Sequence, residues 1–237
     1  MAVIGANGGI GRALVTEIQK QPCVDKIFCC SREQGEIDVN KSTFIKLNVA
    51  DDNSIASAAN EIKSKTNKID VIIVATGILH EGDALRPEKS WRSLNTENLI
   101  KIFQINTIGP AIIAKHFIEF LPTDRKCIFA ALSARVGSIE DNHIGGWYGY
   151  RSSKAALNMM IKSLSIELSR KNSQAIAVTL HPGTVDTSLS KPFQSAVPND
   201  KLFTPSISAN HILKVLDSLQ PIASGGFFAW DGERIPF

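Results

Sequence analysis

A tyrosine and a lysine four residues apart could together move a proton to or from a carbonyl oxygen. Tyr150 and Lys154 open a stretch of helix-forming composition that runs to residue 168. Four residues make about one helical turn, so both side chains share a face of the expected helix. A phenol ordinarily has a pKa of ~10, and an adjacent ammonium group favours the phenolate, so we expect a lowered tyrosine pKa. With a bound hydride carrier, the pair predicts reduction of a ketone or oxidation of an alcohol; without one, a surface helix carries this spacing by chance.

A glycine-rich turn near the start of the chain predicts the site of such a carrier. The apolar run 2–4 is followed at once by Gly5, Gly9 and Gly11, and then by helix-forming residues up to 20. In a strand-turn-helix unit these glycines let a pyrophosphate approach the helix N-terminus, where unpaired N–H groups and the positive dipole end face it. The spacing is a variant of the better-known dinucleotide fingerprint, and the alternative is an ordinary glycine-rich loop.

Apolar runs alternate with helical patterns along the whole chain. The expected strands are 2–4, 26–30, 44–47, 70–75, 127–132, 175–180 and 226–230, and the expected helices are 9–20, 51–66, 96–120, 149–170 and 206–219. This alternation predicts right-handed crossovers and a parallel sheet covered on both faces. We therefore expect an α/β fold of the Rossmann type, with a single doubly wound parallel sheet of about seven strands in one domain over 1–237. Ligands bind such a sheet beyond the carboxyl ends of its strands.

The composition narrows the class of protein. The chain has 237 residues and a formal net charge of +3, which predicts neither a nucleic-acid partner nor a membrane partner. It shows no apolar stretch of membrane-spanning length and no secretory leader, so we expect a cytoplasmic enzyme. The cysteines lack metal-ligand spacing, and the neighbours Cys29 and Cys30 cannot face the same side of a strand. Reduced cysteines and no metal site are therefore expected.

Four segments together resemble the short-chain dehydrogenase/reductase family, and the resemblance covers essentially the whole chain. They are the glycine turn 5–11, the residues Gln104-Ile105-Asn106, the stretch 150–158 and the loop 182–187. The segments 132–139, 145–148, 224–228 and 231–233 are similar, more narrowly, to the C-factor and carbonyl-reductase-like subgroup. The resemblance implies a Rossmann-type oxidoreductase with a nicotinamide cofactor.

The resemblance also implies a role for each matching residue. Tyr150 corresponds to the family's proton-transfer tyrosine, Lys154 to the lysine that also holds the nicotinamide ribose, and Asn106 to the asparagine that pins a water in the proton relay. Asn106 has an alternative role as a structural amide within a helix. The implied cofactor contacts come from the glycine turn, the strand ends and the loop after the sixth strand: Gly5, Asn7, Gly9, Ile10, Gly11, Asn48, Val49, Ala75, Gly77, Tyr150, Lys154, Pro182, Gly183, Val185 and Thr187.

Two places depart from the family pattern. The serine that polarises the substrate carbonyl normally stands three residues before a glycine, and that position is Ala134 here. Ser133 and Ser138 lie close by; we favour Ser133 because it ends a strand, although it could simply cap that strand, and Ser138 stays open. The second departure is the segment 74–77, which reads Val-Ala-Thr-Gly where the family more often has Asn-Asn-Ala-Gly. Thr76 replaces the bracing amide only in part.

The residue after the second strand indicates which nicotinamide cofactor binds. An acidic residue there accepts hydrogen bonds from the adenosine ribose and repels a 2′-phosphate, whereas an arginine attracts that phosphate. The chain has Arg32 at this point and no acid before Glu33. Arg32 therefore predicts NADP(H), with NAD as the alternative if Arg32 is an ordinary surface charge.

Together these residues predict an NADP(H)-dependent oxidoreductase that acts on a small carbonyl compound or secondary alcohol. The segment 188–202 is expected to cover the substrate, whose identity composition does not give. The alternatives are an NAD-dependent dehydrogenase and a nucleotide-binding signalling or sensor protein with weak catalysis, as the C-factor resemblance and the displaced serine suggest. In this family the helices that correspond to 96–120 and 149–170 often pair, which implies a homodimer or a homotetramer.

Overall fold

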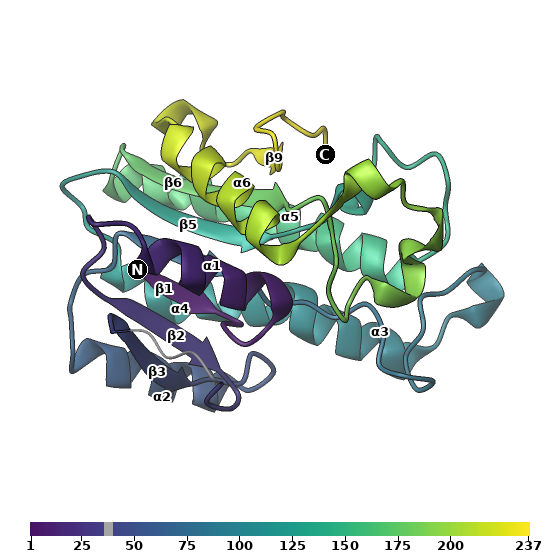
Figure 1. The fold of residues 1–237 in the computed structure, drawn as a ribbon, viewed down its shortest axis with the longest axis horizontal. Coiled ribbons are helices and arrows are strands. Elements are labelled where there is room, and N and C mark those ends of the chain that lie inside the picture. Colours follow the sequence, from purple (N-terminus) through teal and green to yellow (C-terminus); the bar gives the residue numbers. More distant parts are fainter. Residues whose placement is uncertain (36–39) are drawn as a thin grey trace.

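The centre of the molecule is a sheet of seven parallel strands (Figure 1), seen in a computed structural model that describes residues 1–35 and 40–237. The strands in chain order are β1 (Ala2–Ile4), β2 (Ile27–Ser31), β3 (Ser42–Lys46), β4 (Val71–Val74), β5 (Cys127–Leu132), β6 (Ala175–His181) and β9 (Phe227–Ala229). Each predicted strand is present, with its ends within two residues of the predicted ones. The predicted Rossmann-type sheet is confirmed.

The order of the strands reverses beside β1. Across the sheet the order is β3-β2-β1-β4-β5-β6-β9, and Val3 of β1 pairs with Cys29 on one side and with Ile73 on the other. The chain builds outward from β1 to β3, then returns to the other side of β1 to form β4. Because the loops after β1 and β4 leave in opposite directions, we expect a ligand-binding crevice between them at the carboxyl ends of the strands.

Helices cover both faces of the sheet (Figure 1). One face carries α1 (Gly9–Gln19) and α6 (Pro205–Ser218), and the other carries α2 (Asp52–Lys63), α4 (Gly109–Phe117) and α5 (Tyr148–Lys171). A separate apolar core fills the space on each face. Cys29 belongs to the core under α1 and α6, and Cys30 belongs to the opposite core, as alternation along a strand requires. All four cysteines are free thiols.

The prediction of one long helix over 96–120 is wrong in one respect, because the backbone hydrogen-bond pattern of this segment changes in its middle. The structure has α3 (Thr96–Phe103), a π-helical segment (Gln104–Ile108), α4 and a 3-10 turn (Ile118–Phe120). Gly109 N–H donates to the carbonyl of Gln104, five residues back. Pro110 has no N–H to donate to the carbonyl of Asn106, so a regular α pattern cannot continue there. Insertions of this kind are frequent at functional sites.

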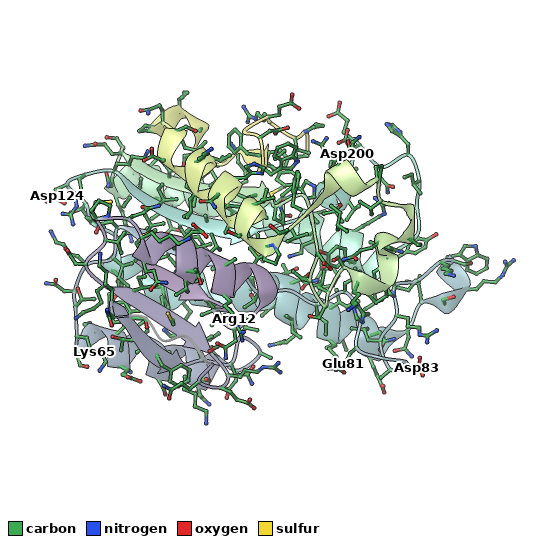
Figure 2. The ribbon with its side chains drawn as sticks, in the orientation of Figure 1. Arg12, Lys65, Glu81, Asp83, Asp124 and Asp200 are labelled. Atoms are coloured by element: carbon green, nitrogen blue, oxygen red, sulfur yellow. The ribbon has the colours of Figure 1, made fainter. Side chains whose placement is uncertain are left out.

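Two loops extend beyond the carboxyl ends of the strands. The loop after β4 precedes α3, and the loop after β6 contains the short paired strands β7 (Thr184–Val185) and β8 (Leu202–Phe203), which the sequence reasoning missed. Figure 2 shows residues of both loops at one end of the molecule, opposite Lys65 and Asp124: Glu81, Asp83 and Asp200. The two loops therefore share the end at which the crevice opens.

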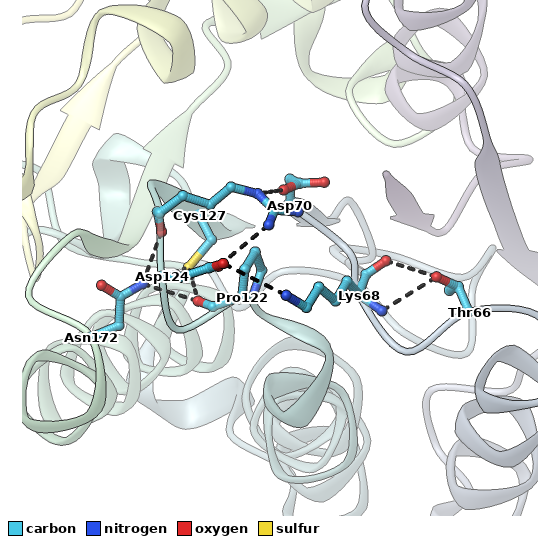
Figure 3. A network of polar contacts seen from close by, with 8 residues as sticks. Thr66, Lys68, Asp70, Pro122, Asp124, Cys127 and Asn172 are labelled. Carbon is cyan, nitrogen blue, oxygen red and sulfur yellow. Dashed lines mark hydrogen bonds and ion pairs between the residues drawn. The ribbon is translucent and has the colours of Figure 1, made fainter.

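A polar network lies at the amino ends of the strands, opposite the two loops (Figure 3). Arg125 Nε donates to Asp70 Oδ1 over 2.7 Å, and Asn172 Nδ2 donates to the backbone carbonyls of Pro122 and Arg125 over 3.0 and 2.9 Å. Exposed ion pairs of this kind contribute about 0–1 kcal/mol each. The network joins the amino ends of β4 and β5 to the end of α5. It therefore acts at the end of the strands opposite the glycine turn. In the described part of the chain, no helix has the length and apolarity needed to cross a membrane.

Candidate active site

Tyr150 and Lys154 lie in the first turns of α5, on the same side of the helix. The Lys154 ammonium nitrogen is 5.9 Å from the centre of the Tyr150 ring. Tyr150 is 8% exposed and Lys154 is buried, whereas Tyr148, two residues earlier, is 39% exposed. The shared face predicted from the four-residue spacing is present, and Tyr148 points to solvent.

The start of α5 is capped by a residue far away in the chain. Trp147, at the N-cap, has a left-handed backbone (φ 50°), and its side chain forms no capping hydrogen bond. Glu88 takes over this function: its Oε2 accepts from the Gly149 N–H over 3.1 Å, and its backbone carbonyl accepts from the Trp147 N–H. Gly149 leaves the space that this requires, because a Cβ there would lie 3.0 Å from Glu88 Oε1. Glu88 is buried, and one of its carboxylate oxygens has no partner in the described residues.

Burial opposes the charged forms of both Tyr150 and Lys154. It raises the pKa of Tyr150 to about 12 and lowers the pKa of Lys154 to about 8. The predicted lowering of the tyrosine pKa by the lysine is therefore wrong for this structure, because the loss of hydration on burial raises that pKa. Lys154 Nζ donates to the carbonyl of Leu132 at the end of β5 over 2.8 Å, which holds the lysine in place.

Asn106 joins three parts of the site. Its Nδ2 donates to the carbonyl of Ile78 and to Ser153 Oγ, and its Oδ1 accepts from the Ile78 N–H over 2.8 Å. The side chain is fully buried within the π-helical segment. A Cβ on Gly77 would lie 3.5 Å from Lys154 Nζ and 3.6 Å from Asn106 Oδ1. Gly77, Asn106 and Lys154 therefore meet at the end of β4.

The two candidate serines differ in what their hydroxyl groups contact. Ser133 directly follows β5, and its buried Oγ has no hydrogen-bond partner among the described residues. Ser138 is also buried, but its Oγ accepts from the Asp141 N–H over 3.1 Å and so stabilises its own loop. Gly137, between them, packs against Lys154 closely enough that a Cβ would come within 2.7 Å of the lysine Cβ. Of the two hydroxyls, only that of Ser133 is unengaged.

The glycine turn forms a backbone cradle at the start of α1. Gly5 has φ +86°, and its N–H donates to the carbonyl of Cys30 at the end of β2. A Cβ on Gly11 would lie 2.0 Å from the carbonyl oxygen of Gly5, and one on Gly9 would lie 2.5 Å from Thr187 Cγ2. No side chain caps the first turn of α1, so the N–H groups around Ile10 are available to an anion.

Side chains with unsatisfied polar atoms surround this cradle. Asn7 Nδ2 and Ser31 Oγ both donate to the carbonyl of Glu33, over 2.6 and 2.7 Å, so they hold the loop after β2 against the glycine turn. Asn7 Oδ1 and Thr76 Oγ1 are buried without a partner in the described residues. Arg32 is exposed on that loop and has no ion pair with residues 1–35 or 40–237. These polar atoms and the cradle fit a dinucleotide, whose phosphates and hydroxyls would engage them.

Three further predicted cofactor residues lie just after β3 and β4. Ala75 N–H donates to the carbonyl of Ile4 over 2.8 Å, and the Ala75 backbone packs on Gly5. At the end of β3, Asn48 Oδ1 accepts from the Ala50 N–H over 3.1 Å. The side chain of Val49 instead packs against Gly109, at the start of α4.

The loop after β6 reaches back to the glycine turn. Gly183 has φ +80° and lies beneath Phe203, and the carbonyl of Pro182 accepts from Ser208 Oγ of α6. Val185 is buried, and Thr187 contacts Gly9. No group of histidine, cysteine or acidic side chains in the described ranges is arranged to hold a metal ion.

Comparisons with known proteins identify the family of the chain. Residues 1–198 match the short chain dehydrogenase family. The C-signal of Myxococcus xanthus is 31% identical over 172 residues, which are 73% of this chain and 95% of that protein. An uncharacterized oxidoreductase of Schizosaccharomyces pombe is 28% identical over 99% of this chain and 96% of its own length.

Solved structures share the fold. The carbonyl reductase Sniffer of D. melanogaster superposes with a TM-score of 0.87 at 22% identity, over 100% of this chain and 98% of that one. The NADPH-bound carbonyl reductase from chicken fatty liver gives the same TM-score at 23% identity, with the same coverage. The resemblance to C-factor and carbonyl reductases that the sequence indicated is confirmed. The chain is therefore a member of the short-chain dehydrogenase family and an NAD(P)-dependent oxidoreductase.

Proposed function

We propose that this chain is an NADP(H)-dependent oxidoreductase that interconverts a carbonyl compound and the corresponding alcohol. One series of contacts supports the proposal. The glycine cradle at Gly5 packs on Thr76, and Gly77 adjoins Lys154, which lies beside Tyr150. A dinucleotide bound in the crevice would thus extend from the cradle toward the only phenol that is buried near it. A tyrosine adjacent to the nicotinamide end is what proton transfer requires.

In the direction of reduction, the carbonyl carbon gains a hydride and the carbonyl oxygen gains a proton. A nicotinamide cofactor held by the glycine cradle and Lys154 would supply that hydride. Tyr150 is protonated at neutral pH, because burial raises its pKa to about 12, and it donates its proton to the oxygen. Ser133 donates a hydrogen bond to the same oxygen while negative charge develops there. Lys154 stabilises the phenolate that remains, Asn106 fixes the backbone of Ile78 nearby, and solvent returns the proton to Tyr150.

The choice of NADP(H) rests on Arg32. The exposed Arg32 guanidinium lies on the loop that Asn7 holds against the cradle, where it would bind a 2′-phosphate. Charge-assisted hydrogen bonds of this kind contribute about 1.5–3 kcal/mol, which corresponds to about one to two decades in Kd. Two solved structures of this fold were determined with bound NADPH or NADP, at 23% and 18% identity.

Paired fluorescence titrations test the cofactor assignment. We expect Arg32→Ala to weaken NADPH binding about tenfold to a hundredfold and to leave NADH binding nearly unchanged. Arg125→Ala is the matched control, since Arg125 is an exposed arginine at the amino ends of the strands, far from the glycine cradle. Equal weakening of both cofactors, or a wild-type preference for NADH, would remove Arg32 from cofactor selection and favour an NAD-dependent dehydrogenase.

A second candidate function is a nucleotide-binding signalling protein. It is favoured by the similarity to the C-signal and by Ala134, which stands where the family has its serine. A panel of aldehydes and ketones incubated with NADPH distinguishes the two. Oxidation of NADPH that depends on the added carbonyl supports the oxidoreductase. Tight NADPH binding without turnover of any carbonyl supports the signalling protein.

A homodimer or homotetramer remains part of the proposal. Apolar side chains are exposed along α5 and the π-helical segment, among them Met159 at 66%, Ile166 at 49% and Ile108 at 42%. Pairing these helices across a two-fold axis would cover them. Light scattering during size-exclusion chromatography tests this, and a monomer at micromolar concentration would contradict it.

A further inference from the structure

A series of edge-to-face contacts leads from the Tyr150 ring through three further aromatic rings. The Trp147 ring lies edge-to-face with Tyr150, with 6.2 Å between the centres, and with Phe193 at 5.0 Å. Phe193 in turn lies edge-to-face with His80 at 5.7 Å. His80 follows β4, Trp147 precedes α5, and Phe193 lies in the 3-10 segment Lys191–Ala196 of the loop after β6. We call His80, Trp147 and Phe193 the ring wall.

The ring wall is held in place by the backbone around it. Trp147 keeps the only left-handed backbone of a non-glycine residue in the described chain, and the Glu88 carbonyl accepts its N–H. His80 Nε2 donates to the carbonyl of Ser188 over 3.0 Å, which ties the loop after β4 to the loop that carries Phe193. A strained conformation persists only where its surroundings fix it, and such conformations gather at functional sites. The wall is therefore positioned before any substrate binds.

We propose that the site takes an aryl carbonyl compound, meaning a ketone or aldehyde with a flat aromatic ring on its carbonyl carbon. This rests on the proposed function, because it assumes that the carbonyl oxygen accepts a proton from Tyr150. Because Trp147 packs on the Tyr150 ring and Phe193 packs on Trp147, we expect a substituent on that carbonyl carbon to lie beside these two rings. Aromatic rings attract one another edge-to-face, since the ring edge is positive and the ring face is negative. A saturated ring of the same carbon number has neither the planar shape nor this charge distribution.

The reaction expected of an aryl ketone is its two-electron reduction. The carbonyl carbon receives a hydride from the reduced nicotinamide, the oxygen receives the Tyr150 proton, and the product is the benzylic alcohol with the oxidised nicotinamide. Solvent then returns one proton to the phenolate. Each turnover therefore consumes one reduced nicotinamide and one proton from solvent.

Acetophenone and cyclohexyl methyl ketone form a matched pair of substrates that tests the proposal. The measured quantity is the ratio of their kcat/KM values with NADPH, compared between variants so that the intrinsic reactivity of each ketone cancels. We expect the aryl ketone to be preferred by the wild type. Phe193→Leu keeps an apolar side chain on an exposed loop and should lower the ratio about threefold to tenfold, as the loss of one ring contact predicts. Trp147→Phe keeps a ring and should largely preserve the ratio.

Trp91→Leu is the control. This tryptophan lies in the loop between β4 and α3, is 62% exposed, and belongs to neither the ring wall nor the site. It should leave the ratio unchanged. Turnover of both ketones with the same ratio in wild type and Phe193→Leu would overturn the aryl proposal and leave the oxidoreductase intact. Absence of NADPH oxidation with any carbonyl compound would overturn the proposed function and this inference with it.

Discussion

Replacing each candidate serine by alanine should separate catalysis from stability. The hydroxyl of Ser133 is buried without a partner, whereas that of Ser138 accepts the Asp141 N–H. If Ser133 supplies the hydrogen bond to the developing oxyanion, then Ser133→Ala should lower kcat by roughly 10²–10³. Ser138→Ala should leave kcat nearly unchanged, because its hydroxyl serves the loop.

The effects on stability should run the opposite way. A buried polar group without a partner costs about 1–3 kcal/mol, so removing the Ser133 hydroxyl should leave the free energy of unfolding unchanged or raise it. Ser138→Ala removes a hydrogen bond and leaves the Asp141 N–H unpaired, which should lower the free energy of unfolding by about 0.5–1.5 kcal/mol.

Two assays on the same preparations decide the matter. The absorbance of the reduced nicotinamide gives kcat with an aryl ketone, and urea denaturation gives the free energy of unfolding. Titration with NADPH controls for cofactor binding, which neither variant should change. The reasoning is refuted if Ser138→Ala loses more kcat than Ser133→Ala, or if Ser133→Ala loses stability and keeps its kcat.

Three further predictions concern other parts of the site. Burial lowers the pKa of Lys154 to about 8 in the folded protein, whereas the unfolded chain keeps the ordinary lysine pKa of ~10.4. Between these two pH values the unfolded chain binds one proton more than the folded protein, so the free energy of unfolding rises with pH across this window. Lys154→Met should therefore melt above wild type near pH 7, with a difference that narrows by about pH 10; a constant difference would contradict this. Gly9→Ala should weaken NADPH binding, because the added Cβ would clash with Thr187 Cγ2. Adding Thr187→Ser removes that methyl group and should restore part of the NADPH affinity. If the double variant binds NADPH no better than Gly9→Ala, this clash is not the cause of the weaker binding. Glu88→Ala should lower the free energy of unfolding by about 0.5–2 kcal/mol through the lost cap on α5, with Glu88→Gln less affected, and equal losses in urea denaturation would argue against capping.

Much of the fold and part of the site follow from short-range patterns. Tyr150 and Lys154 share a face because of a four-residue spacing, and the cradle at Gly5 forms because a strand, three glycines and a helix follow one another. Such patterns depend on a few neighbouring residues, so the sequence carries them directly. The strands were predicted well for the same reason, since buried parallel strands are short apolar runs.

The features that could not be predicted depend on contacts between distant residues. Glu88 caps α5 across 61 positions of the chain, and the left-handed Trp147 has no sequence signal of its own. The raised pKa of Tyr150 comes from burial, which only the packed structure determines. One signal was overlooked: Pro110 follows Asn106 by four residues and marks the change of helical pattern.

The most direct test of the account compares two tyrosines of the same helix. Tyr150→Phe removes the buried hydroxyl, and Tyr148→Phe removes an exposed one two residues away. NADPH oxidation with acetophenone and NADPH binding are measured for both. We predict that Tyr150→Phe lowers kcat by ~10² or more with unchanged NADPH affinity and a normal melting temperature, while Tyr148→Phe matches wild type. Near-normal turnover by Tyr150→Phe would contradict the assignment of Tyr150 as the proton donor.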